Sequence, residues 1–158
     1  MTNTLISMPE SDVKPRDVQF LPIGLNTFIL RSRTWDRLKF EIEYSLQKGT
    51  TANSYIIQAD KTALFDPPGE SFTQNYLESL QKRVDLKNLD YIILGHFNAN
   101  RAITIKALLE LAPQVAFVCT NPAAIGLRGA FPDQELNILT VRGEGAERTI
   151  VGYGDGTC

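Results

Sequence analysis

The chain has 158 residues, a formal net charge of −2, and a composition that is 43% hydrophobic and 22% charged. This length favours one domain with its own core. The near-neutral charge argues against general nucleic-acid binding, which needs a basic surface. No apolar run approaches the roughly 20 residues that a membrane-spanning helix requires.

The first residues, 1–17, are polar and include Glu10, Asp12 and Asp17. This stretch has no apolar core, so it predicts a flexible lead-in and neither a signal peptide nor a transit peptide. The two cysteines, Cys119 and Cys158, do not make a disulfide framework. Cys119 stands in the apolar run "VAFVC", which favours a buried thiol. These features favour a protein of the cytoplasm.

The first half of the chain is rich in β-type patterns. Two short runs lie within residues 18–32 and are broken at Pro22 and Gly24. Residues 37–46, "RLKFEIEYSL", alternate apolar and polar side chains, which predicts a half-buried strand. Residues 53–66, "NSYIIQADKTALFD", predict a hairpin that turns at Asp60-Lys61.

The second half alternates helical and strand patterns. After "PPG" at 67–69, Ser71 and Gln74 fit a capping box that opens a first helix. Residues 89–94, "LDYIIL", predict a central strand buried on both faces. A second helix follows, and Pro113 ends it. The apolar stripe of the first helix consists of Tyr76, Leu77, Leu80 and Val84.

The order continues with "QVAFVCT" at 114–120, which predicts another buried strand. Asn121 and Pro122 fit the N-cap and first position of a third helix, which Gly126 or Gly129 would end. Residues 136–141, "LNILTV", predict a last strand. Residues 143–158 are glycine-rich without periodicity and predict a weakly structured tail.

The candidate site is the sequence "GHFNANR", where the only histidine, His96, follows a predicted strand. A strand followed by His-x-acid-x-acid-His is a metal-binding pattern, because alternate residues of an extended loop converge on one centre. Asn98, Asn100 and Arg101 stand at the other positions here. The amides are neutral and the guanidinium has no lone pair, which predicts at most feeble metal binding.

Two alternatives for Arg101 remain open from the residues alone. Together with Asn98 and Asn100, its guanidinium would suit a small anion, particularly near a helix N-terminus. Arg101 would otherwise point to solvent or pair with Asp66. For Asp66 itself, which precedes Pro67, a turn-capping carboxylate is favoured over a group that orients the pocket.

Three stretches carry a resemblance to a known family: "GTTANSYIIQADKTALFDPPG", "LDYIILGHFNANR" and "ALLELAPQVAFVCTNPAA". With them, residues 18–142 resemble the N-terminal metallo-β-lactamase-like domain of flavodiiron proteins, in the diflavin form of oxygenic phototrophs. The resemblance implies an α/β fold, the N-terminal portion of a metallo-β-lactamase-like αββα sandwich. It places the flexible lead-in at 1–17 and the tail at 143–158.

The family's motif is His-x-Glu-x-Asp-His, and the resemblance transfers it residue by residue. His96 keeps the first metal ligand, Asn98 stands for the Glu, Asn100 for the Asp, and Arg101 for the second His. The chain is thus similar to a branch of the family with degenerate diiron ligands. The family implies an NAD(P)H:oxygen oxidoreductase that reduces oxygen to water as a photoprotective electron sink. Its cofactors are diiron, FMN and NAD(P)H.

The resemblance covers only the front portion of such a protein. The remaining iron ligands and the flavin-binding modules lie further along in the family, so we expect a truncated chain that binds no cofactor and is inactive alone. The alternative is a catalytically silent subunit, which forms a homo- or hetero-oligomer with a related flavodiiron subunit, or a gene remnant. Half a sandwich leaves one sheet face open, which predicts self-association or marginal stability.

Overall fold

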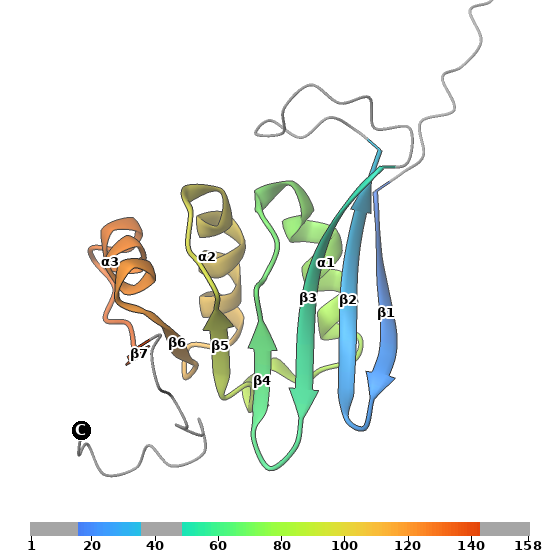
Figure 1. The fold of residues 1–158 in the computed structure, drawn as a ribbon, viewed down its shortest axis with the longest axis horizontal. Coiled ribbons are helices and arrows are strands. Elements are labelled where there is room, and N and C mark those ends of the chain that lie inside the picture. Colours follow the sequence, from blue (N-terminus) through green and yellow to red (C-terminus); the bar gives the residue numbers. More distant parts are fainter. Residues whose placement is uncertain (1–15, 36–48, 143–158) are drawn as a thin grey trace, which may run out of the picture.

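The computed structural model describes residues 16–35 and 49–142. Residues 1–15, 36–48 and 143–158 lie outside the described residues, so the predictions of a lead-in, of a strand at 37–46 and of a tail stay predictions. Within the described ranges the chain forms one seven-stranded sheet and three α-helices (Figure 1).

The strands follow one another across the sheet in chain order. The first four pair antiparallel, and the last four pair parallel, because a helix separates each of those strands from the next. Within the described ranges the bounds confirm the predicted strands, including the hairpin formed by β3 and β4. The predicted break at Pro22 is wrong, because β1 continues through Pro22, which pairs with Phe28 at the edge of the sheet. The strands are β1 Asp17–Gly24, β2 Thr27–Thr34, β3 Thr50–Gln58, β4 Thr62–Phe65, β5 Tyr91–Leu94, β6 Ala116–Thr120 and β7 Ile138–Val141.

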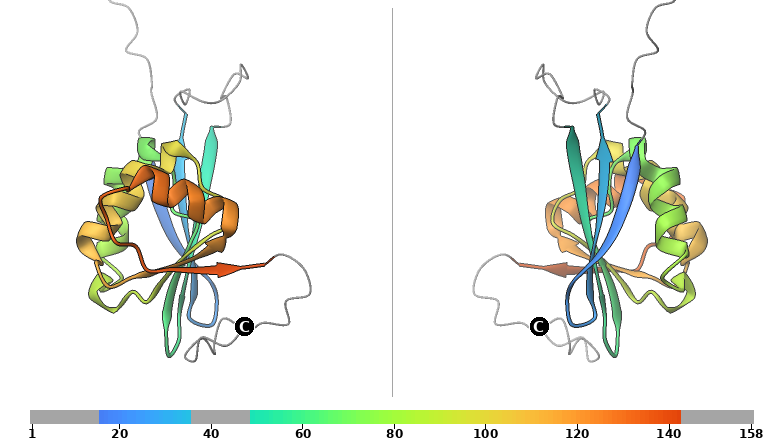
Figure 2. Two further views of the ribbon diagram at one scale, coloured as in Figure 1. Left: turned by 90° about the vertical axis from the view of Figure 1, so that its left-hand side faces the viewer. Right: turned by 90° about the vertical axis from the view of Figure 1, so that its right-hand side faces the viewer.

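The helices are α1 Thr73–Gln81, α2 Ala102–Leu111 and α3 Asn121–Ala130. Each joins two parallel strands, and successive right-handed crossovers in one direction place all three on the same face of the twisted sheet (Figure 2). Short 3-10 turns stand at Glu70–Phe72, Leu86–Asn88 and Ala99–Arg101. Within the described ranges, no helix has the length and apolar character needed to cross a membrane.

The two faces of the sheet differ in how they are covered. On the helix side, four apolar residues lie side by side in the strand register and are fully buried: Ile56, Leu64, Ile92 and Phe117. The opposite face carries a second apolar row that crosses all seven strands. Its members, in register order, are Leu21, Ile29, Tyr55, Phe65, Ile93, Val118 and Leu139.

No described helix covers this second face, which we call the open face (Figure 2). Two members of its row, Ile29 and Val118, are buried, but others keep solvent contact: Tyr55 is 38% exposed, and its neighbour Ile57 is 37% exposed. At the β1 end, Leu21 is 41% exposed and Ile23 is 55% exposed. The prediction that β5 is buried on both faces is therefore wrong, because Tyr91 and Ile93 are only half-buried.

Two helix starts differ from the sequence expectation. The capping box is wrong: Ser71 lies in the 3-10 turn, and Phe72 is the N-cap of α1, without a side-chain cap. Helix α3 has Thr120 as its N-cap, so Asn121 lies one residue inside the helix.

The end of α3 also differs from the expectation. The helix runs past Gly126 and Gly129 to Ala130. Gly126 is accommodated within the helix because the ring of Phe97 packs where a side chain would stand. By contrast, the second helix (α2) and the burial of Cys119 are confirmed.

Candidate functional site at the carboxyl ends of the parallel strands

The carboxyl ends of β4, β5 and β6 meet at one edge of the sheet, the usual place for sites in α/β folds. Asp66 follows β4, and the segment Gly95 to Arg101 follows β5 and leads into α2. Between them lies a cavity of about 370 Å³. Its lining comes from β3, from the loop after β4 and from the turn before α2: Ala52, Asn53, Asp66, Pro68, Gly69, Glu70, Ser71, Phe72, Asn98, Asn100 and Arg101.

The structure brings together three of the four predicted site residues. Asn98, Asn100 and Arg101 line the cavity, whereas His96 is exposed and does not line it. Phe97 lies between the two groups and packs on α3. A Cβ atom at Gly126 would come within 2.7 Å of its ring. The contact between Phe97 and Gly126 thus holds the backbone at Phe97 against α3, between the exposed His96 and the cavity-lining Asn98.

Arg101 forms an ion pair with Asp66, with 2.8 Å between Nη1 and Oδ1. Their side chains are 15% and 37% exposed, respectively. Of the alternatives that the residues left open, the structure therefore selects pairing with Asp66. Glu70 also lines the cavity, so the charge of Arg101 is offset on its own chain. Binding of a small anion by Asn98, Asn100 and Arg101 stays a prediction.

Asp66 does more than cap a turn. Its Oδ1 also accepts a hydrogen bond from the backbone N–H of Gly95 at 3.1 Å, and its own N–H donates to the carbonyl of Ile93 at 3.0 Å. The backbone at Asp66 has a φ of 46°, in the left-handed region that Asp tolerates better than most residues. The carboxylate therefore ties the end of β4 to the segment after β5.

Hydroxyl groups support this edge from inside the core. Ser54 donates to the carbonyl of Phe65 at 2.7 Å, and Tyr76 donates to the Ser54 hydroxyl at 2.7 Å. Burial raises the pKa of Tyr76, so it stays a neutral phenol. The hydroxyls of Thr73 and Thr104 lie 2.6 Å apart and join α1 to α2. Sequence reasoning missed this network, although Ser54 lies two residues before Ile56 in β3 and therefore on the same helix-covered face.

The donor set does not fit a pair of iron ions. Diiron centres need anionic oxygen and imidazole ligands. Among the described residues, no group of three or more His, Cys, Asp and Glu side chains is placed to hold a metal. The carboxylate of Asp66 is already paired with Arg101, and the two asparagines offer neutral amides. These residues therefore provide a polar cavity with an internal ion pair.

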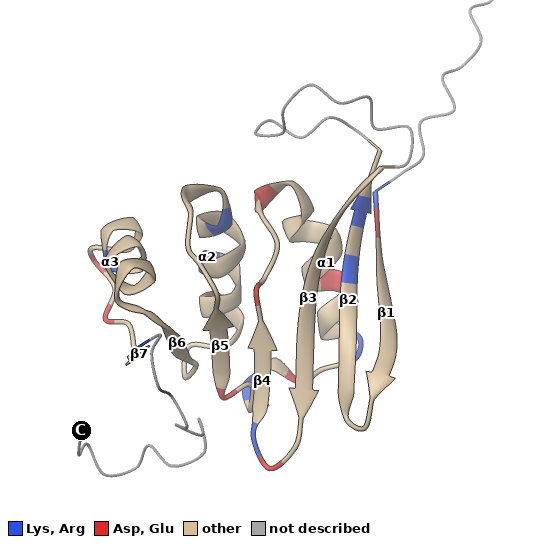
Figure 3. Ribbon diagram, in the orientation of Figure 1, with Lys and Arg blue, Asp and Glu red and all other residues tan. Residues whose placement is uncertain are grey.

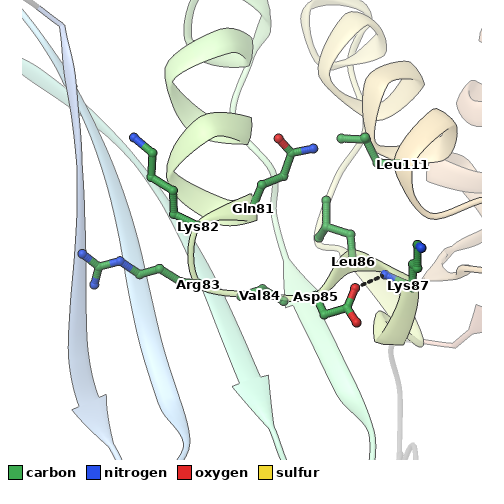
Figure 4. Close-up of a pocket in the computed structure, with 8 residues that line it drawn as sticks. All are labelled: Gln81, Lys82, Arg83, Val84, Asp85, Leu86, Lys87 and Leu111. Carbon is green, nitrogen blue, oxygen red and sulfur yellow. Dashed lines mark hydrogen bonds between the residues drawn. The ribbon is translucent and has the colours of Figure 1, made fainter.

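A second cavity, of about 490 Å³, lies below the C-terminus of α1 (Figure 4). It is lined by Gln81, Lys82, Arg83, Val84, Asp85, Leu86, Lys87 and Leu111. Asp85 accepts a hydrogen bond from the Lys87 backbone, and the Arg83 guanidinium lies 4.9 Å from the centre of the Phe20 ring. The helix C-terminus disfavours anions, so these basic residues are best explained by packing and solvation.

Known sequences match most of this chain, although no family model matches it. It is 66% identical over 134 residues to diflavin flavoprotein A 6 of Nostoc sp. (strain PCC 7120), which covers 85% of the chain and 24% of the relative. It is 40% identical over 119 residues to diflavin flavoprotein A 1 of Synechocystis, covering 75% and 21%, respectively. The chain thus spans about a quarter of the length of these relatives.

Solved structures of related proteins also superpose on most of this chain. A crystal structure of fragment 1–254 of diflavin flavoprotein A 5 from Nostoc superposes with a TM-score of 0.79 at 66% identity, covering 83% of this chain and 52% of that one. A metal-soaked flavodiiron core from Synechocystis gives a TM-score of 0.77 at 61% identity, covering 82% and 33%. A flavoprotein from Thermotoga maritima, 19% identical with a TM-score of 0.72, shares the fold and covers 82% and 33%.

The fold is therefore the N-terminal portion of the metallo-β-lactamase-like flavodiiron core. The chain belongs to the flavodiiron proteins, a family of diiron flavoproteins. Its relatives within that family include the diflavin flavoproteins of cyanobacteria.

Proposed function

We propose that this chain is a segment of a flavodiiron NAD(P)H:oxygen oxidoreductase of the cytoplasm, which reduces oxygen to water as a photoprotective electron sink. Within that oxidoreductase, the segment provides a structural scaffold and a protein-protein interface, and it does not provide a redox-active metal site. The diiron, FMN and NAD(P)H chemistry belongs to complete members of the family, and this chain binds none of these groups alone. The proposal draws on the 66% identity to diflavin flavoproteins.

The ion pair between Arg101 and Asp66 is the observation that carries the non-metal role. In the family's motif, the positions of Asn98 and Asn100 hold carboxylates and that of Arg101 holds an imidazole. Here two negative charges are absent and one positive charge is present, so a bound cation would meet much weaker attraction than the motif provides. His96, the remaining motif ligand, does not line the cavity. We therefore infer a degenerate site without metal.

Contact with a related flavodiiron subunit is the role that remains for a silent segment. The open face offers an apolar surface for it, with Tyr55 and Ile57 each more than a third exposed. An exposed apolar patch of this kind is typical of an interaction surface. The same face also accounts for the self-association that we expect of the chain alone.

The test is to mix the purified chain with an intact diflavin flavoprotein and to measure complex formation by size-exclusion chromatography with light scattering. We expect a mixed complex that Ile57→Lys weakens, because a charge would be buried in the interface. Ile125→Lys is the matched control: Ile125 is 70% exposed on α3, on the other side of the sheet. Absence of a mixed complex, or equal weakening by both variants, would contradict the proposed interface.

A further inference from the structure

Two loops interlock at the edge of the sheet, and each approaches the other at a glycine. A Cβ atom at Gly95 would lie 3.2 Å from Oδ2 of Asp66, and one at Gly69 would lie 3.2 Å from Nδ2 of Asn100. Each glycine thus leaves room for a polar side chain of the opposite loop. The loop after β4 and the segment after β5 are fitted closely to one another on both sides.

The carboxylate of Asp66 is the centre of this contact. Its Oδ1 accepts from Gly95 N–H at 3.1 Å and from Arg101 Nη1 at 2.8 Å. Asp66 also holds a backbone conformation with a φ of 46°, which costs free energy for a residue other than glycine. Such a conformation persists only where surrounding contacts fix it, and these two hydrogen bonds are such contacts.

Arg101 supplies the positive charge at this centre. Its side chain is only 15% exposed, so its guanidinium has lost most of its water and needs a counter-charge. In a metal-binding relative of the same motif, a bound cation would neutralise the carboxylates at this edge. Here the cation is part of the chain itself.

We propose that Arg101 is a positioning residue that replaces a bound metal ion structurally: its guanidinium holds Asp66, and through Asp66 it orders the segment Gly95 to Arg101 without metal. This inference rests on the proposed function, because it assigns a role to the site that the function leaves without iron. It predicts that the two loops stay in place in the metal-free protein.

The two partners are not equivalent. Removing Asp66 leaves a guanidinium that is 15% exposed without its paired carboxylate, whereas removing Arg101 leaves a carboxylate that is 37% exposed and open to water. Loss of Asp66 therefore disturbs the fold more than loss of Arg101. Arg101 variants are the cleaner test for this reason, and Asp66→Asn, which tolerates a positive φ, is the second variant.

The experiment measures amide hydrogen exchange of Gly95, whose N–H donates to Asp66, in the full chain and in Arg101→Ala. We expect Gly95 to exchange at least about tenfold faster in the variant, because the carboxylate is no longer held. Thr62 is the internal control: its N–H donates to the Asp90 carboxylate at 2.8 Å at the opposite end of β4. Its exchange stays unchanged if the fold is intact.

Chemical rescue of Arg101→Ala distinguishes loss of a positioning cation from a general loss of packing. Guanidinium chloride at about 20 mM, far below denaturing concentrations, restores Gly95 protection in Arg101→Ala, whereas sodium chloride does not. Arg101→Lys retains part of the protection. Asp66→Asn also exchanges faster at Gly95, and guanidinium gives no rescue there because the charge is gone.

Two results would overturn the inference. One is Gly95 exchange within twofold of wild type in Arg101→Ala with Thr62 unchanged, and the other is equal rescue by sodium and guanidinium. Iron content, measured on the same wild-type sample, tests the proposed function separately. Stoichiometric iron would contradict that function, while faster Gly95 exchange in Arg101→Ala would still support a positioning role for Arg101.

Discussion

The two faces of the sheet have similar apolar composition but different surroundings. On the helix side, Ile56 and Ile92 are fully buried beneath the helices. On the open face, their neighbours Ile57 and Ile93 keep solvent contact. Strands β3 to β6 carry no charged side chain on either face, and Figure 3 accordingly draws them in tan. The difference therefore comes from the crossover helices, which all lie on one side.

This contrast teaches that strand composition alone does not reveal which face forms the core. A strand that is apolar on both faces is expected between two covering layers. Here one layer is provided by α1, α2 and α3, and the described residues provide no second one. The open face is thus a core-like surface without its covering layer, and it is where we expect association to occur.

Substituting the adjacent isoleucines of β3 tests the contrast most strongly. Ile56→Ala should lower the free energy of unfolding by about 2–5 kcal/mol, because it opens a cavity in the packed core. Ile57→Ala, the matched change on the open face, should cost less than about 1 kcal/mol in the monomer. Urea unfolding of both variants at low protein concentration measures this difference. Equal costs would contradict the assignment of the two faces.

Charge on the open face should change association more than stability. In Tyr55→Lys with Ile57→Lys, we expect the dissociation constant for self-association to rise at least about tenfold, since two ammonium groups would have to be buried. Sedimentation equilibrium across a concentration series measures it. A wild-type chain that is monomeric at every concentration would show that the open face does not drive association.

The two glycines of α3 separate site packing from helix propensity. A Cβ at Gly126 would meet the Phe97 ring at 2.7 Å, whereas Gly129 has nothing within 4 Å. Gly126→Ala should therefore destabilise by about 1–3 kcal/mol and shift the segment after β5. Gly129→Ala should stabilise by about 0.5–1 kcal/mol through helix propensity. Thermal unfolding of the pair tests this, and a stabilising Gly126→Ala would mean that Phe97 moves aside freely.

Acid should weaken the chain through two carboxylates outside the site. The hydrogen bond from Arg33 holds the pKa of Asp17 below its ordinary value, and the backbone N–H of Thr62 does the same for Asp90. A lowered folded-state pKa adds stability above the ordinary carboxyl pKa, and this stability is lost as pH falls through the folded-state value.

Urea midpoints measured from about pH 6 to about pH 2 should therefore fall, and the Asp17→Asn, Asp90→Asn double variant should flatten part of that fall. The effect is the smallest of these predictions, because both carboxylates belong to ion pairs that solvent reaches. An unchanged slope in the double variant would assign the acid sensitivity to other groups.

Much of the fold was predictable from local patterns. The β3–β4 hairpin and the helix that Pro113 ends follow from period and breaker residues alone. The one-sided covering of β5 was not predictable, because a four-residue apolar run has the same sequence pattern whether one layer or two layers cover it. The end of α3 was also missed, since the room that Gly126 leaves for Phe97 is a tertiary contact.

At the site, the motif located the correct edge of the sheet but not its internal arrangement. The chemistry of Asn98, Asn100 and Arg101 already argued against a metal centre. Their spacing did not reveal that His96 would stay outside the cavity. Nor did the spacing reveal that Oδ1 of Asp66 would accept hydrogen bonds from both Gly95 and Arg101, because these bonds depend on the register between β4 and β5.

Iron binding by the purified chain tests the central claim most directly. The chain would be loaded with Fe(II) without oxygen, exposed to a mild chelator, and analysed for iron per chain. We predict far less than one iron per chain, because Arg101 pairs with Asp66 and Glu70 is the one other carboxylate among the residues that line the cavity. Two chelator-resistant irons per chain would contradict the account and would require ligands other than those described.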